Sequence, residues 1–148
     1  KFAKFFGGDV NYWNLDSRSY GYLPVVKEKL FSGYRLQIAA TTDETPFYAL
    51  PFISLRGIPV LRYQGNNVVT METEWRWNLK ERWSLVGFVG AGDAMEKFSE
   101  IGKNIKVAGG AGFRYFLAKD YGIHAGLDVA KGPEVWAWYL TVGSNWFR

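Results

Sequence analysis

The sequence contains no cysteine, so disulfide bonds and thiolate chemistry are excluded. Its single histidine, His124, cannot by itself build a zinc site of the usual kind. No apolar run approaches the ~20 residues that a membrane-spanning helix needs. No signal peptide is visible, and the chain begins at Lys1 without a methionine, as a mature or truncated product would.

The length and net charge of the chain further limit the possible classes of protein. A chain of 148 residues suits a single domain, and we expect residues 1–148 to form one. The net charge of +4 is dispersed along the chain, which is a weak argument for a nucleic-acid partner. We therefore expect no nucleic acid among the partners, and no cofactor or metal.

Apolar and polar residues alternate through the segment 69–91. Successive side chains of a strand point to opposite faces, whereas a helix would scatter both sets around its axis. A short polar reversal at 79–81 divides the segment into the two strands of a long antiparallel hairpin. In its first strand, one face would carry Val69, Met71, Thr73, Trp75, Trp77 and Leu79, and the other Thr70, Glu72, Glu74, Arg76 and Asn78.

The same alternation predicts further strands at 12–23, 30–40, 106–117, 122–129 and 135–146, and residues 1–6 are a candidate eighth. The connections 25–29, 79–81 and 118–121 are short, whereas 41–67 and 92–104 are long. Long strands with tight turns at one end and long loops at the other are typical of a transmembrane β-barrel. The predicted fold is thus an all-β, antiparallel transmembrane barrel with about seven or eight strands in this chain.

Aromatic residues gather at the tight-turn end, as in one interfacial girdle of an outer-membrane barrel. Tryptophans on the apolar faces would contact outer-membrane lipid, while the acidic and basic residues of the other face would line a wet lumen. The alternative is a soluble, lipocalin-like barrel whose apolar face points inward. The clustered tryptophans and the arginines of the polar face favour the membrane. The expected girdle is Trp77, Trp83, Tyr115, Tyr121 and Trp146.

Several motifs resemble the bacterial surface-antigen superfamily, the family of the outer-membrane insertase BamA and its translocation relatives. The segment LRGIPVLRYQGN at 55–66 is similar to the family's arginine-glycine loop, and PFYALPF at 46–52 to the stretch before it. TEWRW at 73–77, VGFVGAG at 86–92 and AGGAGFRY at 108–115 resemble its following strands. The resemblance covers most of the chain from about Leu15 onward.

The resemblance implies a lumenal loop contact and a function. In the family, a long loop folds into a sixteen-stranded barrel, and its arginine contacts a glutamate and an aspartate on the wall. Arg56, followed by Gly57, occupies the arginine position and Glu74 the glutamate position; Gly90 stands where the aspartate is usual, so Glu72 is the expected substitute acceptor. The implied function is to assist insertion or translocation of outer-membrane or secreted proteins.

The chain is short for the family, whose barrels usually follow periplasmic POTRA domains. It resembles the C-terminal half of a barrel without a POTRA domain. It could be a fragment of a larger barrel, half of a ring completed by a second copy, or a small barrel that closes by itself. The alternative function is the membrane anchor or barrel part of a lipid-modifying enzyme.

No catalytic set is visible, and we expect a protein that is not an enzyme. Ser84, His124 and Asp128 are the residue types of a triad, but His124 and Asp128 would lie about 13 Å apart on one strand. We expect these residues to form part of a polar lumenal wall instead. Leu127→Arg should cost about 2–4 kcal/mol near the membrane midplane, and Asp128→Asn much less, because Asp128 is expected beside lumenal water.

Overall fold

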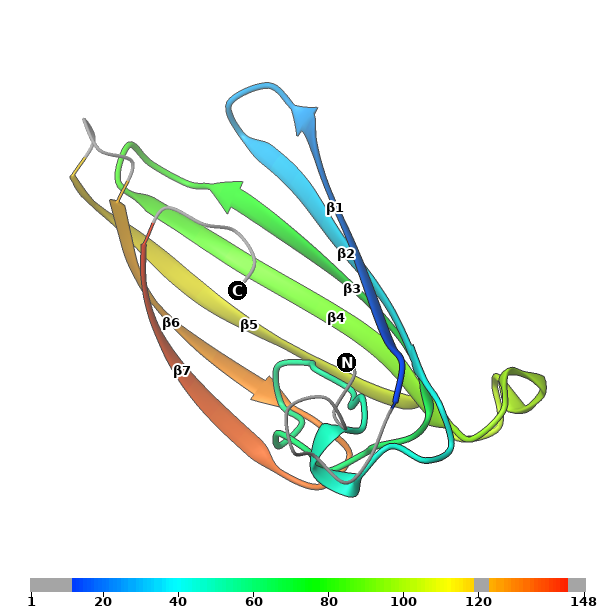
Figure 1. The fold of residues 1–148 in the computed structure, drawn as a ribbon. Helices are drawn as coiled ribbons and strands as arrows, with labels where there is room; N and C mark the ends of the chain where they lie inside the picture. Colours follow the sequence, from blue (N-terminus) through cyan, green and yellow to red (C-terminus); the bar gives the residue numbers. More distant parts are fainter. Residues whose placement is uncertain (1–11, 119–122, 144–148) are drawn as a thin grey trace.

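A computed structural model describes residues 12–118 and 123–143, which form one antiparallel sheet in the order β1-β2-β3-β4-β5-β6-β7. The sheet is strongly curved, with β1 and β7 at its edges (Figure 1). No helix in the described part is both long and apolar enough to cross a membrane. The strands are β1 Asn14–Val26, β2 Leu30–Thr41, β3 Asn67–Asn78, β4 Trp83–Met95, β5 Lys106–Ala118, β6 Ile123–Lys131 and β7 Trp136–Gly143.

The all-β, antiparallel class predicted from the alternation is confirmed, although several boundaries differ. The first strand runs further than expected, to Val26. β4 continues to Met95, so the connection expected at 92–104 begins later. The described strands do not close into a ring. The candidate strand at 1–6 and the girdle residues Tyr121 and Trp146 lie outside the described residues.

The two faces of the sheet differ in chemistry and in exposure. On β3, the outer face exposes Trp75 and Trp77 at 58% and 54% of their surface. On the opposite, inner face of the same strand, Glu72 and Glu74 are only 3% and 2% exposed. This is the reverse of a water-soluble sheet, in which charges face solvent and apolar residues face the core.

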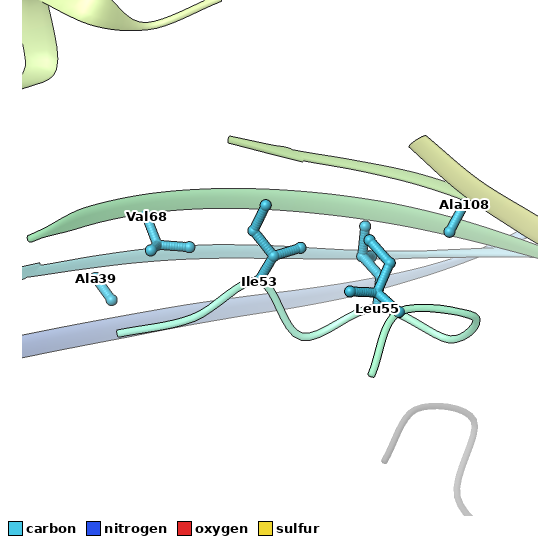
Figure 2. Close-up of a cluster of buried hydrophobic side chains, with 6 residues drawn as sticks. Ala39, Ile53, Leu55, Val68 and Ala108 are labelled. Carbon is cyan, nitrogen blue, oxygen red and sulfur yellow. The ribbon is translucent and has the colours of Figure 1, made fainter. Parts of the chain in front are cut away.

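The loop 42–66, between β2 and β3, folds over one end of the inner face of the sheet (Figure 1). Ile53 and Leu55 project from the loop toward the strands, where they pack against Val68 and other small apolar residues (Figure 2). Burying one such side chain contributes about 1.5–3 kcal/mol, which offsets part of the entropy lost when a long loop is ordered. The cluster consists of Ala39, Ile53, Leu55, Ile58, Val68 and Ala108.

The loop also meets the β6–β7 connection through two glycines. The backbone N–H of Gly57 donates to the hydroxyl of Tyr139 on β7 at 2.9 Å. Gly57 has a φ of +92°, and a Cβ there would lie 2.9 Å from the backbone nitrogen of Gly132. A Cβ on Gly132 would lie 2.0 Å from the carbonyl oxygen of Gly57. The two backbones can therefore approach this closely only because neither residue has a side chain.

We predict that Gly57→Ala destabilises the protein more than Gly102→Ala. Both glycines have a φ of +92°, so both variants suffer the same left-handed strain of about 1–2 kcal/mol. Only the Gly57 variant adds a clash with the β6–β7 connection, because a Cβ at Gly102 meets no atom within 4 Å. Urea unfolding of both variants in detergent micelles measures the difference. Equal unfolding midpoints would show that this close contact does not constrain the loop.

Candidate functional site

A cluster of charged side chains lies between the inner face and the tip of the loop. Arg56 enters from the loop, and strands far apart in the sequence supply the groups around it. Glu72 and Glu74 are two residues apart on β3, so both point to the same face. β2 contributes Arg35, β5 contributes Arg114 and β6 contributes Asp128.

The Arg56 guanidinium contacts all three carboxylates. Its Nε donates to Glu72 Oε1 at 2.8 Å, and its Nη2 lies 2.7 Å from the same oxygen. Nη2 also lies 2.6 Å from Glu74 Oε2, as an ion pair without hydrogen-bond alignment. Nη1 reaches Asp128 Oδ2 at 3.3 Å. The guanidinium carbon sits 3.5 Å from the centre of the Phe88 ring, which adds a cation–π contact.

Two arginines on the strands, Arg35 and Arg114, bind the same carboxylates. Arg35 Nη2 lies 3.0 Å from Glu72 Oε2, and the same nitrogen donates to the backbone carbonyl of Ser54 in the loop. Arg114 binds Asp128 with both terminal nitrogens, and Nη2 donates to Oδ2 at 2.9 Å. The charges therefore alternate along a chain from Arg35 through Glu72, Arg56 and Asp128 to Arg114, and Glu74 joins this chain at Arg56.

Burial and nearby negative charge act in opposite directions on the pKa of Arg56. Burial by itself lowers the pKa of the guanidinium, but the nearby Glu72 and Glu74 outweigh that effect, so the pKa is raised above its usual value. Arg56 therefore stays charged. Removing one member of such a buried network leaves an uncompensated charge, which typically costs about 3–5 kcal/mol.

The structure brings together the residues that the loop motif singled out. Arg56 contacts Glu74, as expected, and it also contacts Glu72, the expected substitute. The third acid, Asp128, was not anticipated as a partner of Arg56. A side chain at Gly90 would have to displace Leu55, because a Cβ there would lie 2.6 Å from Leu55 Cδ2.

The expectation that Asp128 lies beside lumenal water is wrong. Its exposed fraction is 0%, because the loop covers the inner face above it and Arg114 binds both of its oxygens. The alternation of 122–129 assigned Asp128 to the polar face correctly. Its burial depends on the path of the loop and on the register of β5 with β6, neither of which the alternation specifies.

The other residues singled out from the sequence have separate surroundings. The girdle residues Trp77 and Trp83 are exposed on the outer face, and the half-buried Tyr115 has its ring centre 4.8 Å from that of Trp83. Ser84 Oγ donates to Asn78 Oδ1 at 2.8 Å, and His124 hydrogen-bonds with Arg76. Ser84, His124 and Asp128 therefore do not form a triad. Within residues 12–118 and 123–143, no group of three or more His, Asp and Glu side chains is arranged to hold a metal ion.

A second contact holds the loop at the rim of the sheet. Arg62 Nε donates to Glu134 Oε2 at 3.0 Å, and the Tyr63 hydroxyl donates to Glu134 Oε1 at 2.6 Å. The hydrogen bonds from Tyr63 and Arg62 hold the pKa of Glu134 below its usual value. Because Arg62 and Glu134 are exposed, salt and water weaken this contact relative to the buried one.

No protein-family model matches the chain, and no curated protein sequence matches it. The likeness to the surface-antigen superfamily therefore consists of short motifs. One of them, the arginine-glycine loop, coincides with the Arg56 contacts to Glu72 and Glu74.

We predict that Asp128→Asn lowers the free energy of unfolding by about 3–5 kcal/mol, because Arg114 and Arg56 lose a buried anionic partner. The control is Asp16→Asn, which removes an exposed partner of Arg18 and should cost less than about 1 kcal/mol. Reversible unfolding in detergent micelles compares the two variants. Similar small losses would mean that the inner face is hydrated and that Asp128 is not needed to hold the network.

Proposed function

We propose that this chain is part of an outer-membrane β-barrel of the surface-antigen superfamily, and that it assists the insertion or translocation of other proteins. The observation that carries the proposal is the inverted sheet. Its outer face exposes large apolar side chains, and its inner face buries arginines and carboxylates. Alternation of apolar-out and polar-in is the pattern of transmembrane barrels.

The outer face has the composition that lipid requires. Exposed apolar residues occur on every described strand except β6, whose outer-face residues are half-buried, so they are spread across the sheet rather than confined to one strand. In water such a surface would promote association. The soluble, lipocalin-like alternative needs the apolar residues inside, whereas the described interior carries Arg35, Glu72, Glu74 and Asp128. The outer apolar residues are Met71, Trp75, Trp77, Trp83, Leu85, Val89, Val107, Phe113, Trp136, Trp138, Leu140 and Val142, among others.

The edges of the sheet constrain how a barrel could close. Each strand is antiparallel to the next, so β1 and β7, the first and last of seven, run in the same direction. Direct pairing of β1 with β7, in one copy or between two parallel copies, would be parallel. Antiparallel closure needs an odd number of further strands. These would come from the rest of the protein or from another chain, and without them unpaired backbone groups would face lipid at a cost of several kcal/mol each.

The buried arginine supports the family assignment. A loop of this length is unusual as a simple hairpin connection, and here it is held on the inner face by Arg56 and by the apolar cluster. The resemblance to the superfamily implies that its members also hold a long loop inside the barrel through an arginine. The match of motif and contact is therefore the second support for the proposal.

We predict that the tryptophans of the outer face contact lipid. In single-tryptophan variants that retain only Trp75 or only Trp138, acyl-chain brominated lipids should quench the fluorescence strongly. A variant that retains only Trp13, which precedes β1 at the long-loop end, is the control and should be quenched less. Absence of quenching for Trp75 and Trp138 in reconstituted protein would contradict the membrane location.

A client-folding experiment tests the proposed activity. The full chain is reconstituted in vesicles, an unfolded outer-membrane barrel is added, and its folding is followed by the mobility shift of unheated samples in gels. We expect faster client folding than in empty vesicles. Arg56→Ala should alter the acceleration, whereas Arg18→Ala, at an exposed ion pair, should not. Correctly inserted protein that leaves the folding rate unchanged would contradict the activity and favour the membrane anchor of a lipid-modifying enzyme.

A further inference from the structure

The connection between β4 and β5 is a folded loop that holds apolar side chains away from the protein. Residues 96–105 include the 3-10 turn η3 Phe98–Glu100, and the Ile101 N–H donates to the carbonyl oxygen of Phe98 at 3.2 Å. Phe98 and Ile101 are nevertheless 48% and 59% exposed, and Ile105, just before β5, is 54% exposed. Single exposed apolar residues are common, but a structured turn that presents a group of them indicates a contact surface.

A hydrogen bond to Asp93 holds this loop toward the outer side of the sheet. Asp93 follows the alternation of Leu85 and Val89, whose side chains are exposed on the outer face of β4. Asp93 itself is only 5% exposed, and its Oδ2 accepts a hydrogen bond from the N–H of Gly102 at 2.7 Å. The loop therefore bends toward the outer face at Asp93. It lies beyond the ends of β4 and β5, apart from the loop 42–66 (Figure 1).

The position of Asp93 along β4 matches the height of the apolar layer of a bilayer. Trp83, at the tight-turn end, and Asp93 lie ten residues apart on this strand. At ~3.3 Å per residue, this spacing is ~33 Å along the strand, or ~25 Å in height at the tilt of about 40° that is usual in transmembrane barrels. The apolar band of such barrels is about 25 Å tall, with aromatic residues at both edges. If Trp83 marks one edge, Asp93 and the loop attached to it lie at the other.

A pair of side chains on β6 and β7 marks the end of the sheet where the long loops lie. Lys131 ends β6, Trp136 begins β7, and the two are cross-strand neighbours. Lys131 Nζ lies 5.0 Å from the centre of the Trp136 ring, and Trp136 is 63% exposed. A tryptophan at the head-group level, beside a lysine whose amine reaches toward water, is typical of a membrane interface. This pair supports an interface at the long-loop end independently of the loop 96–105.

The charges of the loop balance one another. Glu96 and Glu100 stand against Lys97 and Lys103, and Lys103 Nζ lies 3.7 Å from Glu100 Oε1. The loop therefore has no net charge with which to attract an anionic surface, and an exposed ion pair of this kind contributes little. Association of the loop with a membrane depends instead on burial of its apolar side chains, so zwitterionic lipid should suffice.

We propose that the loop 96–105 is an interfacial anchor, which inserts Phe98 and Ile101 among the lipid head groups and upper acyl chains while Asp93 holds it against the outer face. Burial of these side chains in lipid fixes the height of β4 and β5 in the bilayer. The proposal rests on the membrane location proposed above. It adds a lipid contact outside the strands, so it can fail while the strands still span a bilayer.

The chain has no cysteine, so one introduced cysteine can carry an environment-sensitive fluorophore at a chosen position. Phe98→Cys reports on the loop and Val89→Cys on the middle of the outer face. Phe47→Cys is the control, because Phe47 is 77% exposed and lies in the 3-10 turn η2 of the loop 42–66. Each labelled protein is reconstituted in phosphatidylcholine vesicles in which some of the lipid carries a spin-label quencher, either near the carbonyl groups or near the end of the acyl chain.

We expect the Phe98 probe to be quenched most by the shallow quencher, the Val89 probe by the deep one, and the Phe47 probe by neither. A Phe98 probe quenched no more than the Phe47 probe, while the Val89 probe is quenched, would overturn the anchor and leave the membrane location intact. If the Val89 probe is not quenched either, both the anchor and the membrane location are wrong.

A pair of unlabelled variants removes the influence of the fluorophore. Phe98→Ser and Phe47→Ser each remove an aromatic side chain that is exposed on a loop. Only Phe98→Ser should lower the urea midpoint of unfolding in phosphatidylcholine vesicles, because only this aromatic ring is buried in lipid. Equal midpoints for the two variants would contradict the anchor.

Discussion

The inner face of this sheet depends on the insertion of one guanidinium among three buried carboxylates. Glu72, Glu74 and Asp128 converge from β3 and β6, and their mutual repulsion in a dehydrated space would be prohibitive without a cation. Arg56 comes from a loop, so the three carboxylates gain their shared cation only when the loop is in place, in addition to Arg35 and Arg114 of the strands. We therefore expect folding of the loop and dehydration of this part of the inner face to be coupled.

The strands could be predicted because each one separates two environments. With Trp75 and Trp77 on one face and Glu72 and Glu74 on the other, period-two alternation is unambiguous. The end of β4 was harder, because the Gly92–Asp93 stretch resembles a turn in sequence. There Asp93 is buried and accepts a hydrogen bond from the Gly102 N–H at 2.7 Å. Pairing with β3 therefore overrides the local turn preference.

The site could be predicted only in part. Composition and alternation placed Glu72, Glu74 and Asp128 on one face, but an arginine in a loop is ordinarily solvated, and only the resemblance singled out Arg56. The role of Asp128 depends on the register of β5 with β6. In that register, Arg114 lies two residues along β5 from the residue that pairs with Asp128. No local pattern encodes that register. Leu55 fills the space beside Gly90, and the third acid at Arg56 is Asp128 of β6.

The two attachments of the loop differ in strength because they differ in access to water. The Arg56 contacts are buried and share one cation among three anions, so losing any partner leaves an unbalanced charge. The Arg62, Tyr63 and Glu134 contact at the rim is exposed, and such pairs contribute little net free energy. We therefore expect thermal opening of the loop to begin at the rim contact and to be resisted by the contacts of Arg56.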